Sequence, residues 1–278
     1  MALVGKSLVS FSDVSPRLVG LDGWLNAAAA SPAQYNVAAM EAQFPYVVRA
    51  LERDLQFRIN QIQVVGNSDG TYAPANAVTG QPAPDGLHEV KVENGYTYYQ
   101  DDASVFYHIR LYERPVQQVQ RMRFMWNPGT LIYAPDPSWY QVEFKTGDFY
   151  LIPYTGAGFT GGAAIAFSQL SLIFGLCPQI PNIQFVDYIA GLPDGWQNAL
   201  EWGDLWMIIT MRCAIKVLED ISELFDSGRI SKTVNYMGFS ETLNYERFMR
   251  RIQQLTIDCD KKERVFQAQN TPIAAVMG

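Results

Sequence analysis

The segment from Ile183 to Phe225 limits the fold more than any other, because a strand pattern there turns at a glycine and leads into a long amphipathic helix pattern. Ile183 and Phe185 lie two positions apart, as residues on one face of a strand do, and Ala190-Gly191 ends the alternation. We therefore expect a short strand that runs directly into the longest helix of the chain.

The helix pattern begins at Asp204 and repeats its apolar residues at intervals of four and three, which places them on one helix face. These residues are Met207, Met211, Ala214, Leu218, Ile221 and Phe225. Asp226-Ser227-Gly228 follows, and glycine is favoured just after a helix end. The pattern predicts a helix about 33 Å long whose apolar stripe forms part of a core.

A wider pattern surrounds this segment. After the turn Tyr188-Ile189-Ala190-Gly191 come Leu192-Pro193-Asp194, the helix ending in Glu223-Leu224-Phe225-Asp226, and Phe239 to Tyr245, which reads FSETLNY. Upstream, Trp139 to Pro153 reads WYQVEFKTGDFYLIP. This order resembles the head-to-tail adaptor (connector) proteins of tailed bacteriophages. In that family a strand ends in a tyrosine and an Ala-Gly-Phe-like turn, an Ile-Pro pair opens a helix, and a serine-rich linker precedes a last charged helix.

The resemblance covers roughly the C-terminal half of the chain and implies a structural virion protein rather than an enzyme. Subunits of that family form homo-oligomeric rings of about twelve copies, which suits a closed heterologous contact. Such a ring would lie at the head-tail junction, between the portal protein and a neck or tail-terminator protein, after assembly in the host cytoplasm. Genomic DNA would pass through its channel without sequence-specific binding.

The composition is that of a folded protein. The chain as a whole is too acidic to present a basic surface for nucleic acid. The 278 residues are 48% hydrophobic, enough for a substantial core. The formal net charge of −7 and the sequence pI near 4.9 argue against DNA binding, because DNA affinity comes largely from neutralising phosphates. No stretch reaches the ~18 uninterrupted apolar residues of a membrane span, so we expect no membrane contact.

The expected fold class is α+β, with N-terminal helices and two long C-terminal helices around an inserted antiparallel β-rich body. The expected divisions are an extended N-terminal arm (1–30), short helices (31–56), the β-rich body (57–191), the long helix pair with its linker (192–266) and a C-terminal tail (267–278). Pro45 is expected to open one of the short helices. The loop 66–86, rich in glycine, proline and asparagine, is expected to be disordered or to reach a neighbour.

Two hairpins are expected within the β-rich body. Asn94-Gly95 separates the strand patterns at 88–93 and 96–100, which is a strong signal for a two-residue turn. A second hairpin spans Trp139 to Tyr154, where Val142 and Phe144 can face Phe149 and Leu151. Arg121 and Arg123 share one strand face, so they can reach an acidic partner or a phosphate, or else form local ion pairs on a solvated face.

The last helix is expected to begin after a cap at Ser240-Glu241-Thr242 and to continue through Phe266. It is the most basic part of an acidic chain. Its cations are expected to face the DNA channel or an acidic partner, with a solvated face as the alternative: Arg247, Arg250, Arg251, Lys261, Lys262 and Arg264.

The tail beyond the last helix turns from polar to apolar, and apolar residues gain little from remaining in water. We therefore expect the tail either to be disordered or to dock into a neighbour, and the resemblance makes the portal that neighbour. The residues expected to bind the portal are Thr271, Pro272, Ile273, Val276 and Met277.

No catalytic or cofactor motif stands out. The two histidines, His88 and His108, lie in strand patterns, and neither a zinc-protease nor a nucleophile-elbow motif is present. Cys177, Cys213 and Cys259 are widely spaced and are interpreted as small buried hydrophobes, so no metal or cofactor is expected. Two other functions stay open: another tail or neck component, such as a tail-end or decoration protein, and a carbohydrate-active enzyme with paired carboxylates.

Overall fold

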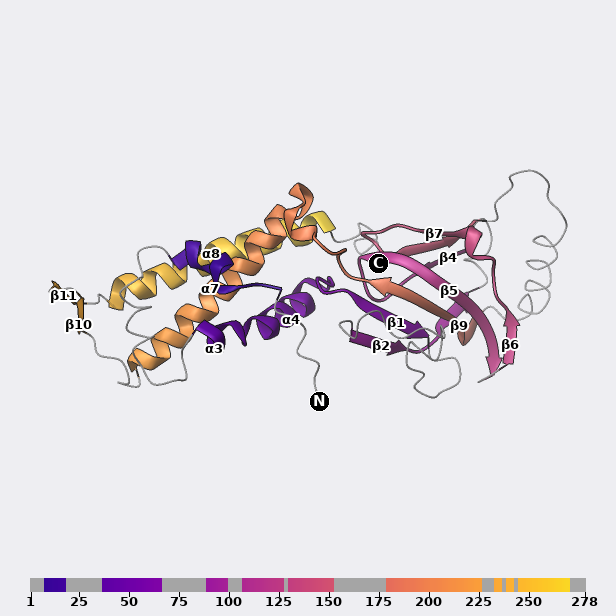
Figure 1. The fold of residues 1–278 in the computed structure, drawn as a ribbon. Helices are drawn as coiled ribbons and strands as arrows, with labels where there is room; N and C mark the ends of the chain where they lie inside the picture. The colour runs from indigo at the N-terminus through magenta and orange to yellow at the C-terminus, as the bar shows by residue number, and fades with distance from the viewer. Residues whose placement is uncertain are drawn as a thin grey trace. The chain divides into compact units, whose positions relative to one another are not determined.

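The computed structural model describes residues 8–18, 37–66, 89–99, 107–127, 130–152, 179–226, 233–236, 239–242 and 245–270. The chain is a mixed α+β protein that divides into two compact units (Figure 1). Unit 1 comprises Met1–Leu55 and Gly195–Gly278, and unit 2 comprises Gln56–Asp194. Unit 2 is therefore an insertion in the sequence of unit 1.

Unit 1 is mainly helical. Its elements are α1 (Phe11–Val14), the 3-10 helix η1 (Ser15–Leu18), α3 (Val37–Glu41), α4 (Phe44–Leu55), the 3-10 helices η5 (Trp196–Asn198) and η6 (Leu200–Trp202), α7 (Gly203–Asp226), β10 (Thr233–Tyr236), β11 (Phe239–Thr242) and α8 (Tyr245–Asn270).

Helix α7 is the centre of unit 1 and confirms the helix predicted from Asp204 to Phe225. Its predicted stripe is buried at Met211, Ala214, Leu218 and Ile221, whereas Met207 is half-buried and the side chain of Phe225 is not described. Burial extends to other faces, with Ile208, Ile209 and Cys213 fully buried, because α1, η1, α4 and α8 all pack against α7. In Figure 1, α8 runs back along α7 in the opposite chain direction.

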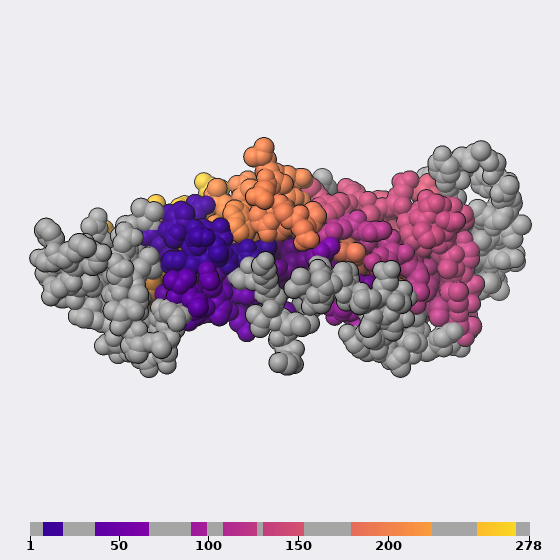
Figure 2. Space-filling model, viewed as in Figure 1, coloured from indigo at the N-terminus to yellow at the C-terminus, as the bar shows by residue number. Residues whose placement is uncertain are grey.

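The N-terminal helices cover another side of α7. Phe44, Val48, Leu51 and Leu55 are buried at helical spacing along α4, as the pattern after Pro45 predicts. The predicted extended arm is wrong at residues 11–18, which are helical. Asp13 accepts a hydrogen bond from the Ser10 backbone N–H at 2.9 Å, so the start of α1 is capped locally. Figure 2 shows α1 and η1 (indigo) beside α3 and α4 (violet) on the visible face of unit 1.

Unit 2 consists of strands. They are β1 (Ile62–Gly66), β2 (Glu89–Glu93), β3 (Tyr96–Tyr99), β4 (Tyr107–Arg110), β5 (Val116–Asn127), β6 (Thr130–Tyr133), β7 (Tyr140–Val142), β8 (Asp148–Leu151) and β9 (Gln179–Ala190), with the 3-10 helix η4 (Pro137–Trp139) before β7.

The larger sheet is built around β9. It has the order β2-β1-β9-β5-β6, and β3 pairs with the part of β9 that β1 leaves open. All described pairs in this sheet are antiparallel except β1 with β2, which is parallel, so the expectation of an antiparallel body holds for most of the sheet. A second sheet has the order β4-β8-β7, and the two share one hydrophobic core that includes Phe124, Phe149 and Tyr188.

The first predicted hairpin is wrong and the second is largely confirmed. Strands β2 and β3 flank Asn94-Gly95 but pair with β1 and β9, not with each other. A Cβ at Gly95 would lie 2.9 Å from the Phe185 ring, so this glycine lets the chain pass close to β9 instead of closing a hairpin. In the second hairpin, β7 and β8 pair with Val142 opposite Phe149.

Element ends depart from the predictions in three further places. Strand β9 begins at Gln179, before the predicted Ile183, and Pro181 lies within it. Ser240-Glu241-Thr242 is not a helix cap, because these residues pair with β10 as part of β11. Helix α8 starts at Tyr245 and continues to Asn270, into the predicted tail. The loop segment 67–86 lies outside the described residues, while Gly66 belongs to β1.

Candidate functional site

Helix α8 carries the predicted cations and is held on α7 by an apolar inner face. Ile252, Leu255, Cys259 and Phe266 are buried at spacings of three, four and seven, the repeat of a helix that packs along one side. Burial raises the pKa of the Cys259 thiol to about 12, so this thiol is neutral at physiological pH. The buried side of α8 therefore serves packing and leaves the opposite side available for contacts.

An ion-pair cluster fixes the two helices against each other. Arg212 of α7 donates from Nε to Glu263 Oε1 at 2.5 Å and from a terminal nitrogen to Glu263 Oε2 at 2.6 Å, which is a bidentate pair. The same guanidinium reaches Asp260 at 3.3 Å. The hydrogen bonds that Arg212 donates to Glu263 raise the pKa of Arg212. Because Glu263 is only 8% exposed, this pair holds the helices in one register.

The side of α8 that points away from α7 is cationic and partly apolar. Arg250, Lys261 and Arg264 are exposed, and so are Ile257 (67%) and Val265 (51%). Six cations against four acids give α8 a formal charge of +2, in a chain whose formal net charge is −7. We call Arg250, Gln254, Ile257, Lys261 and Arg264 the outer face of α8.

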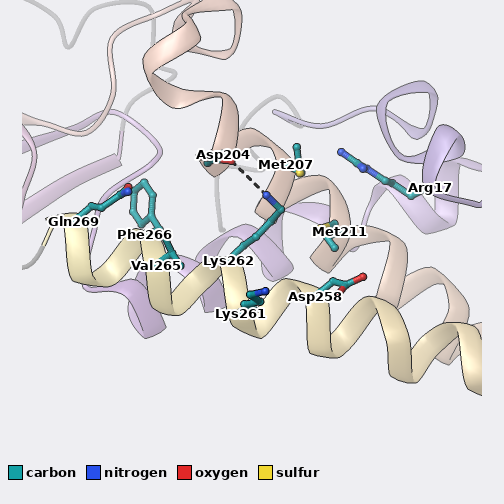
Figure 3. A pocket seen from close by; sticks show the side chains of 10 residues that line it. All are labelled: Arg17, Asp204, Met207, Met211, Asp258, Lys261, Lys262, Val265, Phe266 and Gln269. Carbon is teal, nitrogen blue, oxygen red and sulfur yellow. Dashed lines mark hydrogen bonds and ion pairs between the residues drawn. The ribbon is translucent and has the colours of Figure 1, made fainter.

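A groove of about 460 Å³ lies beside this face, between α7, α8 and η1 (Figure 3). Its apolar lining comes from Met207 and Met211 of α7 and from Val265 and Phe266 of α8. Lys262 Nζ lies 3.4 Å from Asp204 Oδ1 and forms an ion pair across the groove, as the dashed line in Figure 3 marks. Arg17, Asp258, Lys261 and Gln269 complete the polar lining.

The predicted site residues thus fall into three groups. Arg250, Lys261 and Arg264 share the outer face of α8, whereas Arg251 is half-buried and Lys262 is engaged with Asp204. The side chain of Arg247 is not described. The predicted portal-binding residues, Thr271, Pro272, Ile273, Val276 and Met277, lie outside the described residues. Ile257 is not among the predicted contact residues, although its position four residues before Lys261 places it on the same helix face as that cation.

Arg121 and Arg123 of β5 have an acidic partner within the sheet. Asp187 of β9 is 2% exposed and lies 2.8 Å from an Arg121 terminal nitrogen and 2.9 Å from one of Arg123. The backbone N–H of Gly66 donates to the same carboxylate at 2.9 Å. The cluster joins β1, β5 and β9, so we assign these arginines a structural role rather than phosphate binding.

The nearest approach to a paired-carboxylate site in the described part of unit 2 is Glu93 with Glu113. Lys91 forms ion pairs with both carboxylates, and Arg58 pairs with Glu113. Tyr96 and Tyr188 donate to Glu93 at 2.9 and 3.0 Å. Burial raises the pKa of Glu93; it acts in the same sense on Glu113, but hydrogen bonds from Arg58 and Lys91 hold the pKa of that carboxyl below its ordinary value.

Those contacts occupy both carboxylates. The side chains of Glu93 and Glu113 are only 5% and 14% exposed, which leaves little carboxylate surface for a glycan. Among the described residues, no group of three or more His, Cys, Asp and Glu side chains is arranged to hold a metal ion, and no described helix is long and apolar enough to cross a membrane. The arrangement in unit 2 therefore favours a structural network.

Comparison of the chain with protein-family models gives no match, and comparison with curated proteins gives none either.

Proposed function

We propose that the chain is a head-to-tail adaptor of a tailed bacteriophage, a structural virion protein that forms a ring between the portal and the neck or tail. The observation that carries this proposal is the helix pair of unit 1. A deeply buried α7 supports an α8 whose outer face is cationic and exposes aliphatic residues. The resemblance in the C-terminal half of the sequence supports the same conclusion.

The chemistry of the described surfaces suits assembly better than catalysis. The buried charged clusters of unit 2 are joined into its sheets, and α8 carries a row of exposed cations. A ring of about twelve copies would present α8 repeatedly, because a closed ring repeats each heterologous contact in every subunit. An acidic chain is also suited to a DNA conduit, since acidic walls do not retain phosphates.

Within this proposal, the ring lies at the head-tail junction of the virion and DNA passes through it without sequence-specific binding. The apolar tail residues Thr271 to Met277 contact the portal, and unit 2 offers strands and loops to the neck or tail-terminator protein. Assembly takes place in the host cytoplasm before the ring joins the head.

Electron microscopy of the purified full chain tests the ring. We expect negatively stained particles with a central opening and a single rotational symmetry, of about twelve subunits, because the portal-matched adaptor must close on itself. Mass photometry of the same sample should give one dominant oligomer. A chain that stays monomeric at every concentration in both measurements would contradict the proposal.

A further inference from the structure

We propose that the outer face of α8 binds a second copy of this chain, at the exposed acidic residues Glu219 and Glu223 near the end of α7. This inference rests on the proposed ring and identifies one of the contacts that would close it. Two partners were expected for the cationic helix, DNA and an acidic protein surface. This inference favours the acidic protein surface.

The exposed aliphatic residues on α8 are the first reason. Ile257 is 67% exposed and lies one turn from Lys261, and Val265 is 51% exposed one turn further along. A surface that only lines a DNA path gains nothing from exposed aliphatic side chains, whereas the centre of a protein interface buries them within a polar rim. The mixture of Ile257 with Lys261 and Arg264 is therefore typical of a protein contact.

No ion pair is described for the cations of the outer face, although exposed Asp258 lies one turn from Lys261 and lines the same groove. The ion pairs described for α8 use Asp260, Lys262 and Glu263, and these pairs leave out Arg250, Lys261 and Arg264. Asp260 and Glu263 point toward Arg212 of α7, away from the outer face. These cations are therefore available to an acidic surface of another molecule.

The chain itself supplies such acids. With α8 at a formal +2, the remainder of the chain carries a formal −9. Glu219 and Glu223 are exposed four residues apart on α7, so they lie on one side of that helix. The nearby Lys216 forms its ion pair with Asp220 at 2.7 Å and attracts Glu219 and Glu223 only at longer range, so neither glutamate belongs to a described ion pair of α7.

The spacing of the two sets is complementary. Lys261 and Arg264 are three residues apart and Glu219 and Glu223 are four apart, so each pair spans about one helical turn. The two sets lie on different helices, so the same contact can repeat from one subunit to the next, as a ring requires.

Charge-reversal variants of the full chain test this contact. The variants are Lys261→Glu with Arg264→Glu, and Glu219→Lys with Glu223→Lys. We expect each double variant alone to self-associate about tenfold more weakly or worse than the wild type, because like charges then meet. An equimolar mixture of the two should recover association, since each supplies the surface that the other lacks. Sedimentation velocity at several protein and salt concentrations measures the effect.

The matched control is Arg53→Glu, which changes a cation of α4 that is 80% exposed in unit 1 and should leave association unchanged. Circular dichroism of every variant checks that the fold is retained. Ile257→Ser removes an aliphatic side chain without changing the charge, so it should weaken association with little dependence on salt. A wild-type level of association in both charge-reversal variants would overturn the contact and leave the ring proposal intact.

Two other outcomes also count against the inference. A monomeric wild type would remove both the ring and the contact. Normal assembly of Lys261→Glu with Arg264→Glu, together with loss of binding to a short DNA duplex, would instead assign the outer face to nucleic acid.

Discussion

Gly191 sets the path of the chain where β9 ends. Its φ of +104° lies in the region that favours glycine, and a Cβ there would lie 2.3 Å from the Asn60 carbonyl oxygen. The Gly191 N–H donates to the Pro115 carbonyl at 2.8 Å, and its own carbonyl accepts from Gln117 at 3.0 Å. These contacts leave the residue no room to move away from Asn60.

We therefore expect Gly191→Ala to lower the free energy of unfolding of unit 2 by about 2 kcal/mol or more, because the side chain meets backbone atoms in a strained conformation. Gly203→Ala is the matched control. Gly203 has a helical φ of −58° and its added Cβ would meet nothing within 4 Å, so alanine there should be neutral or stabilise by up to about 1 kcal/mol. Guanidinium denaturation of both variants measures the difference, and equal effects would contradict the account of Gly191.

Asp148 makes part of the stability of unit 2 depend on pH. Burial raises the pKa of this carboxyl, but hydrogen bonds from Arg110, Thr146 and His108 outweigh burial and hold the pKa below the ordinary 3.8. The folded chain therefore binds fewer protons at Asp148 than the unfolded chain does as the pH falls. The stabilisation is complete above 3.8 and is lost as the pH falls through the folded pKa.

We expect Asp148→Asn to be destabilising near neutral pH and progressively less so in acid. Urea denaturation at about pH 6 and about pH 3 measures the two differences in the free energy of unfolding. Glu143→Gln changes an exposed acid in the same turn region and should show little pH-dependent difference. If the loss in the free energy of unfolding caused by Asp148→Asn stays constant with pH, the ionised carboxylate is not the source of the stabilisation.

Among the elements, the α7 and α8 pair depends on Arg212. Arg212→Ala leaves Glu263 buried without its bidentate partner, so we expect a loss of about 3 kcal/mol in the free energy of unfolding of unit 1. Arg212→Lys should recover only part of that loss, because a lysine ammonium cannot form both bonds of the guanidinium. Denaturant titrations give these values. Arg53→Ala is the control, because this exposed side chain should contribute less than about 1 kcal/mol to the free energy of unfolding. Full recovery by lysine would show that charge alone matters.

The same elements show what the sequence could predict. Helices α4 and α7 follow from local periodicity, because their buried residues recur every three or four positions. The pairing of β2 with β1 and of β3 with β9 could not be read from the Asn94-Gly95 turn signal, since the partners lie 27 positions away for β2 and 80 to 88 positions away for β3. The cations of α8 were predicted, but their division between an outer face and the Lys262–Asp204 pair depends on how α8 packs.

At the scale of the whole molecule, the chain combines a helical unit that carries the cationic outer face of α8 with a β-rich unit whose core holds the Asp187 and Glu93 networks. The sequence predicted the buried role of α7 and the basic character of α8, and the proposed adaptor function rests on these together with the resemblance. Charge and burial describe one subunit, whereas an adaptor is defined by what lies above and below its ring. The position of the protein in a particle therefore tests the function more directly than any property of the free chain.

The proposed adaptor function requires that a phage encodes the chain, and the decisive measurement is a symmetry-resolved reconstruction of the portal vertex in virions of that phage. We predict a ring of density directly beneath the portal that accommodates the two units, with α8 at the contacts between subunits. Density for this chain at the tail tip or on the capsid surface, or its absence from purified virions, would contradict the adaptor function.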